Sequence, residues 1–266
     1  MPVQPAPDAP IIVLVVADSA RSQDPALTQR KIDLYVAALG RSGGIPAPVS
    51  AATGAVDRDR FFATMAGLVL TGGPDLDPAL YGEAVAGATD IDTERDALDH
   101  MAWLAAQERK VPIFGVCRGL QAINVFSGGS LLQDVPSHAG TPYGDGPART
   151  HSMEIDPNSR LARALAAGAP EGLAATDEHD DTPELVVNTY HHQAVTQATL
   201  AKSLRAVGWA SSEAGRLVEA LESRDDHWVV GVQCHPERTE STPDEFEGVW
   251  EAFVRAAREA AEVTPA

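Results

Sequence analysis

Short apolar runs alternate with longer segments of helical periodicity along this chain. Five apolar runs predict strands, at residues 11–17, 67–70, 112–116, 185–189 and 228–234. Four segments with apolar residues three or four positions apart predict helices, at residues 25–39, 93–110, 118–126 and 246–262. This alternation predicts an α/β fold with a mainly parallel central sheet and helices on both faces. In such folds the site lies at the carboxyl ends of the strands.

The same spacing predicts which side of two helices faces the core. The helix at 93–110 is expected to bury Leu98, Met101, Leu104 and Ala105. The helix at 246–262 is expected to bury Phe246, Trp250, Phe253 and Val254. Gly40 is expected to cap the helix at 25–39, because glycine readily takes the backbone conformation that ends a helix.

The distribution of turn residues predicts one domain with irregular loops. Residues 1–10 are Pro-rich and predict a disordered tail, whereas residues 11–262 are expected to form a single domain. Residues 136–149 are rich in turn-forming residues and residues 168–183 are acidic, so we expect a loop at each place.

The net charge of the chain and the length of its apolar runs exclude some classes of binding partner. Lys and Arg number 20 against 38 Asp and Glu, so the formal net charge is −18. Such a surface repels phosphate backbones and anionic lipids, which argues against nucleic-acid and membrane partners. No apolar run reaches the ~20 residues that span a bilayer. Residues 1–10 contain no Lys or Arg, so we expect a cytoplasmic protein and not a secreted one.

A candidate nucleophile stands between a predicted strand and a predicted helix. Residues 115–119 read Gly-Val-Cys-Arg-Gly, which is the G-x-C-x-G form of a nucleophile elbow with Cys117 at its centre. A sharp turn strains the central residue, and glycines on either side lack the Cβ that would clash there. The helix N-terminus favours the thiolate. The alternative is that Cys117 is a small buried hydrophobic residue, the usual role of a lone cysteine.

A candidate base follows the last predicted strand. His235 and Glu237 are two residues apart, so an extended backbone would point both side chains to one side. Pro236 favours an extended conformation at His235. A carboxylate beside an imidazole stabilises imidazolium, which in turn stabilises a cysteine thiolate. The alternative is a surface histidine next to an unrelated acid. Cys234 should point away from His235 and pack in the core.

Two backbone N–H groups are candidates for holding the oxyanion that forms when sulfur attacks a carbonyl. One belongs to Arg118, directly after the nucleophile, and the other to Gly73, just after the predicted strand at 67–70. The alternative for residues 72–74 is an ordinary Gly-Gly-Pro turn.

Together these stretches resemble the class I glutamine amidotransferase superfamily and, within it, the γ-glutamyl-γ-aminobutyrate hydrolase branch. The resemblance is carried by residues 71–83, 95–104, 112–135, 187–195 and 231–237. The Cys and His-Pro-Glu segments are typical of the superfamily. The GGPDL, YG and YHHQ segments narrow the resemblance to the branch.

The resemblance implies a flavodoxin-like α/β fold and a catalytic triad of Cys117, His235 and Glu237. The implied reaction is hydrolysis of a γ-glutamyl amide through a glutamyl thioester, without a metal or an organic cofactor. Arg95 and Asp96 are expected to form a structural ion pair near the pocket, and neither is expected to be catalytic.

The resemblance also implies substrate-binding residues. Gln121 matches a position that helps to hold the α-amino and α-carboxylate groups of the glutamyl moiety. Tyr190, His191 and His192 match the segment that lines the glutamyl pocket, although packing is the alternative role for at least one of the two histidines.

Three functions remain open from the sequence. A stand-alone hydrolase would release glutamate and an amine, such as γ-aminobutyrate or a related amine from polyamine degradation. A glutaminase subunit would instead deliver ammonia to a separate synthetase. A non-enzymatic paralogue would keep only the fold, but the intact Cys117, His235 and Glu237 disfavour it. The expected partner is a small γ-glutamyl amide. The sequence does not identify the amine that is released, and it does not decide whether the protein forms a homodimer.

Overall fold

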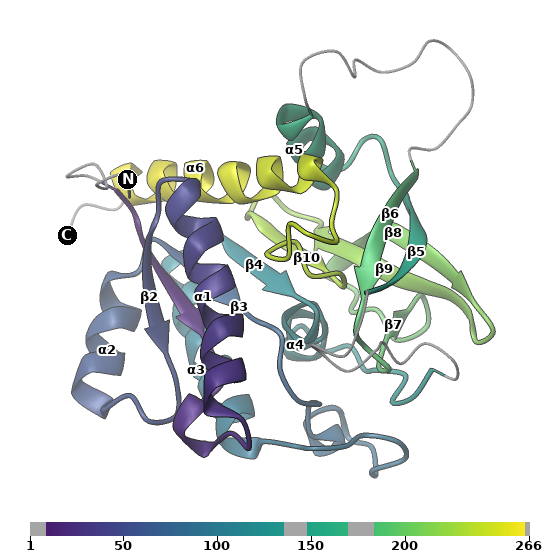
Figure 1. Ribbon diagram of the computed structural model, residues 1–266, viewed down its shortest axis with the longest axis horizontal. Coiled ribbons are helices and arrows are strands. Elements are labelled where there is room, and N and C mark those ends of the chain that lie inside the picture. The colour runs from purple at the N-terminus through teal and green to yellow at the C-terminus, as the bar shows by residue number, and fades with distance from the viewer. Residues whose placement is uncertain (1–8, 136–147, 170–183, 264–266) are drawn as a thin grey trace.

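A ten-stranded mixed sheet organises the chain (Figure 1). The computed structural model describes residues 9–135, 148–169 and 184–263. The core of the sheet is five neighbouring parallel strands, which in sheet order are β2 (Ile45–Val49), β1 (Ile11–Val15), β3 (Gly67–Leu70), β4 (Ile113–Val116) and β10 (Val229–Val232). The fold is therefore α/β with a mostly parallel central sheet, as the alternation of segments predicts.

Antiparallel strands extend the sheet beyond β10. In sheet order they are β9 (Gly215–Ser223), β8 (Leu204–Ser212), β5 (Arg149–Ile155) and β6 (Glu184–Thr189), with β7 (Val195–Thr196) also paired to β9. Of these strands the sequence predicts only β6, because charged residues such as Arg205 and Glu219 interrupt the other apolar runs. It also misses β2, where Pro46 and Pro48 remove two donors. An edge strand tolerates that loss.

Helices cover both faces of the sheet (Figure 1). One face carries α1 (Pro25–Arg41), α5 (Arg160–Gly168) and α6 (Glu247–Val263). The other carries α2 (Ala55–Thr64), α3 (Thr93–Arg109) and α4 (Arg118–Phe126). Three short 3₁₀ helices lie in the connections, at Ser19–Arg21, Pro78–Tyr81 and Asp244–Phe246. Because strand side chains alternate, β1 directs Ile12 and Leu14 into one core and Val13 into the other.

The buried side of α3 differs from the prediction. Met101 and Leu104 are 40% and 53% exposed, so their expected burial is wrong. The buried residues of α3 are Arg95, Asp96, Leu98, Asp99, Ala102, Trp103 and Ala106. The physical reason is that charged side chains at the start of α3 point into the protein, where they form an ion cluster below the site. By contrast, all four residues expected to face inward near α6 are buried.

The end of α1 also differs from the prediction. Gly40 lies inside the helix, which ends at Arg41 and is followed by Ser42 as its capping residue. The left-handed backbone position falls at Gly43, where φ is 82°. The helix therefore runs two residues further than predicted, and the left-handed glycine lies three positions later than expected.

Parts of the chain named in the sequence predictions lie outside the described residues. They are residues 1–8 of the expected tail and most of the two expected loops, at 136–147 and 170–183. Ala9 is buried, and the Pro10 carbonyl accepts the Ile45 N–H at 2.9 Å, so these residues belong to the fold. In the described ranges, no helix combines the length and apolar character needed to cross a membrane.

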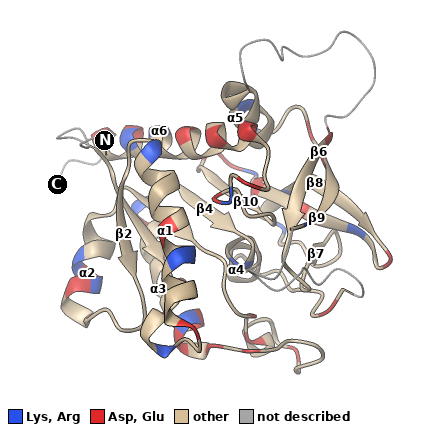
Figure 2. Cartoon of the chain, viewed as in Figure 1, with Lys and Arg blue, Asp and Glu red and all other residues tan. Residues whose placement is uncertain are grey.

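Charged residues avoid the centre of the sheet (Figure 2). β1, β3, β4 and β10 contain no Lys, Arg, Asp or Glu. The buried charges of the ion cluster described below therefore come from helices α3 and α4, beside the carboxyl ends of these strands.

Candidate active site

Cys117 occupies a strained turn between β4 and α4. Its φ of 54° and ψ of −108° form a backbone conformation that L-residues rarely adopt, at a cost of about 1–3 kcal/mol. Its N–H donates a hydrogen bond of 2.8 Å to the Val232 carbonyl of the neighbouring strand β10. The turn therefore places the thiol at the carboxyl ends of the strands, beside the first turn of α4. The thiol therefore lies at the end of α4 that carries the partial positive charge of the helix dipole.

The two glycines of this turn are required by close backbone contacts. A Cβ on Gly119 would lie 1.9 Å from the Leu70 carbonyl oxygen. A Cβ on Gly115 would lie 2.6 Å from the Gly119 backbone. α4 can therefore approach β3 and β4 this closely only without side chains at these two positions, which is the steric reason for the motif.

His235 lies between Glu237 and Cys117. Its Nδ1 is 2.7 Å from Glu237 Oε1, and the Cys117 side chain lies close enough to the ring to raise the pKa of the imidazole. Because Glu237 occupies Nδ1, Nε2 is the nitrogen available to the sulfur. β10 ends at Val232, and residues 235–238 form a turn in which the Arg238 N–H donates to the His235 carbonyl at 3.1 Å. The backbone therefore turns at residues 236 and 237 instead of continuing extended to Glu237, and the turn still brings the side chains of His235 and Glu237 together.

The charges around His235 favour its protonated form. Burial alone would lower the pKa of this imidazole, but the Glu237 carboxylate and the Cys117 sulfur raise that pKa from 6.5 to about 10. An imidazolium beside sulfur is the pairing that activates a cysteine nucleophile. Cys234 differs because it is fully buried and burial raises the pKa of its thiol, which fits a packing role.

Two residues that the sequence did not single out hold the base and its surroundings in place. The Tyr35 hydroxyl of α1 accepts the Gly72 N–H at 3.1 Å. Burial raises the pKa of Tyr35, and the nearby Glu237 carboxylate raises it further. Asn188 of β6 accepts the His235 N–H at 2.8 Å and donates to the His235 carbonyl at 3.1 Å. Helical spacing predicts only that Tyr35 faces the core. For Asn188, the presence of a single amide side chain within an apolar strand could have indicated a role in the site.

Gly73 and Arg118 both line the cavity that contains Cys117. Arg118 is the first residue of α4, so its backbone N–H has no partner within the helix. The Arg118 side chain runs past Gly73, where a Cβ would lie 3.1 Å from the Arg118 Cδ. Their role in holding an oxyanion stays a prediction.

A buried ion cluster lies under this part of the site. The Arg118 guanidinium bonds to both Asp96 and Asp99, and Arg95 bonds to Asp99 at 3.0 Å. Arg95 also reaches two backbone carbonyls, at 2.8 and 3.3 Å. The expected pairing of Arg95 with Asp96 is therefore wrong, because residues four apart on a helix share a face and adjacent residues do not. Two arginines and two aspartates leave the cluster without net charge.

A cavity of about 220 Å³ opens beside Cys117. Its walls come from residues 73–75, 89–90, 117–118, 121 and 190–193. The predicted substrate-binding residues Gln121, Tyr190, His191 and His192 are thus brought together on one cavity with the nucleophile. Within the described ranges, no group of three or more His, Cys, Asp or Glu side chains is arranged to hold a metal ion.

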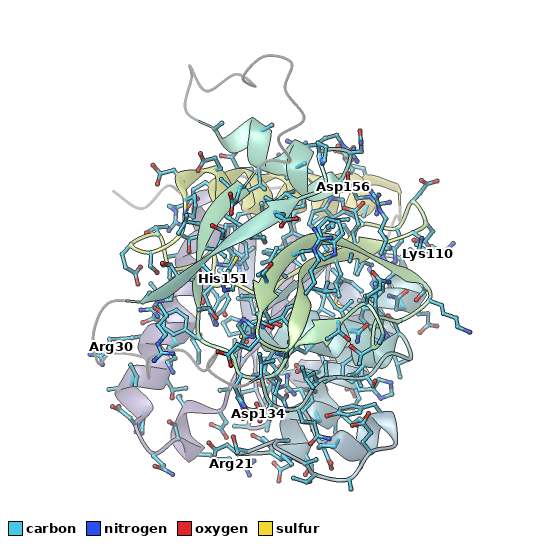
Figure 3. The ribbon with its side chains drawn as sticks, turned by 90° about the vertical axis from the view of Figure 1, so that its right-hand side faces the viewer. Arg21, Arg30, Lys110, Asp134, His151 and Asp156 are labelled. Carbon is cyan, nitrogen blue, oxygen red and sulfur yellow. The ribbon has the colours of Figure 1, made fainter. Side chains whose placement is uncertain are left out.

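The two adjacent histidines have different surroundings. His192 Nε2 lies 2.9 Å from Asp75, and its Nδ1 lies 3.2 Å from Asp134, which is labelled in Figure 3. His191 Nδ1 lies 2.9 Å from the Gln193 carbonyl, and its Nε2 lies 3.8 Å from the buried Glu219. Each histidine thus has its ring nitrogens directed at protein groups, which fits a part in building the cavity wall.

Tyr190 forms a wall next to the base. Its ring meets the His235 ring edge-on, with 5.4 Å between the ring centres. On the Tyr190 ring lies the Arg238 guanidinium, 4.4 Å from the ring centre. Tyr190 therefore restricts the movement of the imidazole while also lining the cavity.

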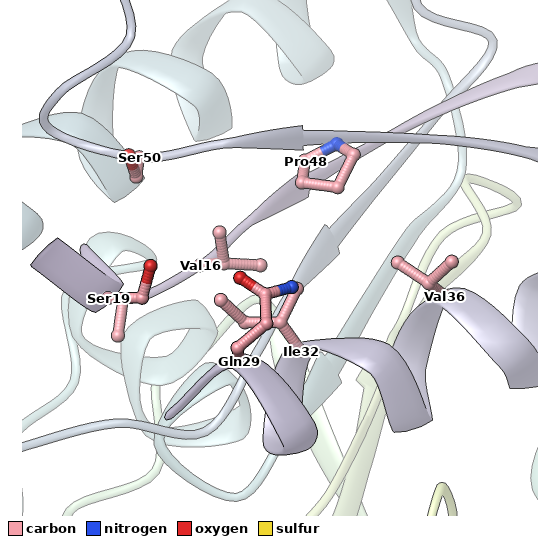
Figure 4. A pocket seen from close by; sticks show the side chains of 8 residues that line it. Val16, Ser19, Gln29, Ile32, Val36, Pro48 and Ser50 are labelled. Carbon is pink, nitrogen blue, oxygen red and sulfur yellow. The ribbon is translucent and has the colours of Figure 1, made fainter. Parts of the chain in front are cut away.

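A second cavity, of about 200 Å³, lies at the carboxyl ends of β1 and β2 against α1 (Figure 4). Apolar side chains such as Val16, Ile32 and Val36 line it together with Gln29 and Ser50. None of its lining residues is Cys, His, Asp or Glu, so it offers no pair of nucleophile and base. The candidate nucleophile Cys117 lies on the other cavity.

Comparison with known proteins places these features in a family. A model of the family described as Peptidase C26 matches residues 10–237. The chain belongs to the Peptidase C26 family. A relative from Escherichia coli O157:H7 named gamma-glutamyl-gamma-aminobutyrate hydrolase is 30% identical over 86% of this chain and 87% of its own length. Protein NtpR of Enterococcus hirae is 35% identical over 71% of this chain and 73% of its own length.

Other Peptidase C26 relatives carry only provisional glutamine amidotransferase names. Among solved structures, the glutaminase domain of a Trypanosoma brucei CTPS with bound acivicin superposes with a TM-score of 0.59. It is 16% identical, and the match covers 94% of each chain. The expected glutamine amidotransferase-like fold is thus confirmed, and the chain is a member of a hydrolase family.

Proposed function

We propose that this Peptidase C26 protein hydrolyses γ-glutamyl amides, with Cys117 as nucleophile, His235 as acid and base, and Glu237 as the group that orients His235. The observation that carries the proposal is the position of His235, which is hydrogen-bonded to Glu237 and lies close enough to Cys117 for the two side chains to interact electrostatically. The preferred substrate is γ-glutamyl-γ-aminobutyrate or a related γ-glutamylated amine, which the E. coli relative's name supports.

The proposed reaction proceeds in two halves. The Cys117 thiolate attacks the γ-carbonyl carbon, and the backbone N–H groups of Gly73 and Arg118 hold the oxyanion. The His235 imidazolium gives its proton to the amine nitrogen, the C–N bond breaks, and a glutamyl thioester remains. His235 then takes a proton from water, whose oxygen attacks the thioester carbon. The C–S bond breaks, glutamate leaves with the hydroxyl group, and the thiolate–imidazolium pair is restored.

Release of glutamate from γ-glutamyl-γ-aminobutyrate tests the proposal. The wild-type protein should release glutamate without any partner, and Cys117→Ala should release none above background, because the thioester cannot form. Equal rates for the two proteins would refute the assignment. Turnover of glutamine that appears only after a synthetase is added would instead point to a glutaminase subunit.

A further inference from the structure

Gln193 is a buried amide with no hydrogen-bond partner for its side chain. It is 1% exposed, and neither its Nε2 nor its Oε1 is satisfied among the described residues. A buried polar group left in this way loses its hydrogen bonds to water without replacement, and it requires an explanation in a native structure. The position of Gln193 offers one, because the residue lines the cavity at Cys117.

The backbone of Gln193 is fixed from two sides. Its carbonyl accepts a hydrogen bond of 3.0 Å from Gln121 Nε2 and lies 2.9 Å from His191 Nδ1. Gln133 is a useful contrast, since it is another buried amide but all its groups are used. Its Oε1 accepts a backbone N–H at 2.7 Å, and its Nε2 donates to Glu83 at 3.1 Å and to a backbone carbonyl at 2.9 Å. The fold can therefore satisfy a buried amide, and at Gln193 it does not.

The other polar side chains of the cavity are mostly acceptors. Gln121 uses its Nε2 on the Gln193 carbonyl and on Gln233 Oε1, which leaves its own Oε1 for the cavity. Asp75 and Asp90 also line the cavity and can only accept when ionised. These groups suit an ammonium, and they cannot bind a carboxylate.

The basic side chains of the cavity are engaged elsewhere, apart from the buried Nε of Arg118, which has no partner among the described residues. The terminal nitrogens of Arg118 bond to Asp96 and Asp99. Both ring nitrogens of His192 face carboxylates, at 2.9 Å from Asp75 and 3.2 Å from Asp134. The Gln193 amide is thus a side-chain N–H donor in the cavity wall that no group among the described residues uses.

We propose that Gln193 is a specificity-determining residue, which donates a hydrogen bond from Nε2 to the α-carboxylate of the glutamyl moiety. The α-ammonium then lies on the side of the cavity where Gln121 presents its oxygen. This inference rests on the proposed γ-glutamyl specificity. It predicts that the protein distinguishes substrates by the α-carboxylate, through a residue that takes no part in bond breaking.

Chromogenic anilides that differ by one group test the proposal. We compare γ-glutamyl p-nitroanilide with 4-aminobutanoyl p-nitroanilide, which lacks the α-carboxylate, and with glutaryl p-nitroanilide, which lacks the α-amino group. Gln193→Leu should lower kcat/KM for the γ-glutamyl and glutaryl substrates by about ten- to a hundred-fold, mainly through KM, because a hydrogen bond to a charged group is lost. The 4-aminobutanoyl substrate should be cleaved equally by both proteins.

Matched variants separate this role from a structural one. Gln193→Glu keeps the side-chain shape but replaces the donor by a carboxylate, so it should discriminate against the α-carboxylate more strongly than Gln193→Leu. Gln133→Leu removes a buried amide outside the cavity, and any loss it causes should be the same for all three substrates. An equal loss on the γ-glutamyl and 4-aminobutanoyl substrates in Gln193→Leu would overturn the proposal.

Product binding gives a second measurement that does not depend on turnover. Glutamate should raise the melting temperature of Cys117→Ala, and adding Gln193→Leu should remove that rise. γ-Aminobutyrate, which lacks the α-carboxylate, should give the same small shift in both proteins. An unchanged rise with glutamate, or no rise in Cys117→Ala, would contradict the role of Gln193. Failure of the proposed hydrolysis is a different outcome, since it appears as equal glutamate release by wild type and Cys117→Ala.

Discussion

The backbone of Cys117 stores strain that a residue without a Cβ would release. Its φ of 54° is unfavourable for every residue with a side chain. Cys117→Gly should therefore be more stable than Cys117→Ala by about 1 kcal/mol, although both are inactive. Urea unfolding of the two variants measures the difference. Equal midpoints would mean that the turn relaxes in the variants and that the strain is not imposed by the surrounding sheet.

The pKa of His235 sets a pH dependence for activity. Protonated His235 is needed to expel the amine, and its pKa of about 10 keeps it protonated at neutral pH. The first half-reaction should therefore weaken as pH rises through about 10. Glu237→Gln removes the carboxylate that raises this pKa, so the fall should move to lower pH. The pH profile of kcat/KM measures the shift, and identical profiles would exclude Glu237 as its cause.

The same group makes folding depend on pH in a defined direction. The pKa of His235 is higher in the folded state than the ordinary value of 6.5. Its contribution to stability is therefore complete below pH 6.5 and is lost as pH rises through about 10. The wild-type protein should lose more stability over that range than His235→Gln, which chemical denaturation at several pH values can measure.

At the scale of elements, α3 and α4 are joined by the ion cluster. Asp99 is fully buried and bonds to both Arg95 and Arg118. Asp99→Ala leaves buried arginine charge unpaired and should destabilise the protein by about 3–5 kcal/mol. Asp59→Ala breaks an ion pair whose carboxylate is 71% exposed and should change stability by less than about 0.5 kcal/mol. Denaturant midpoints compare the two variants, and similar effects would contradict the structural role of the cluster.

The parallel strands could be predicted from the sequence because they are buried on both faces. β1, β3, β4 and β10 therefore read as uninterrupted apolar runs. The antiparallel strands other than β6 were not predicted, because a residue such as Glu219 is buried inside β9 although it is charged. The buried side of α3 was misjudged for the same reason. An apolar pattern cannot reveal a helix face that carries Arg95 and Asp99 into the interior.

Some parts of the site could be predicted from the sequence and others could not. Cys117, His235 and Glu237 belong to short local motifs, so their proximity could be expected from the strands they follow. The supporting contacts could not, since Asn188 reaches His235 and Tyr35 reaches Gly72 only through the three-dimensional arrangement of β6 and α1. The match to a family model ends at residue 237, just after the last of these motifs.

At the scale of the whole molecule, α6 covers one face of the central sheet, and it lies beyond residue 237, where the match to the family model ends. Trp250 is fully buried, and the centre of its ring lies 4.9 Å from the centre of the Phe114 ring on β4. Trp250→Ala should destabilise the protein by about 3–5 kcal/mol, because it opens a cavity beneath the central sheet. Its exposed neighbour supplies the control, and Glu251→Ala should have little effect. Thermal unfolding distinguishes them, and a small effect of Trp250→Ala would mean that α6 is not required for the core.

The Cys117 N–H and the Val232 carbonyl join the two halves of the site through a single rung of the sheet. Residues more than a hundred positions apart in the chain are thus held in register before any ligand arrives. No conformational change is therefore needed to bring the Cys117 sulfur and the His235 imidazole together. A covalent inhibitor should therefore find Cys117 and His235 already in position. The rate of inactivation of the protein should then depend on how fast the inhibitor enters the cavity.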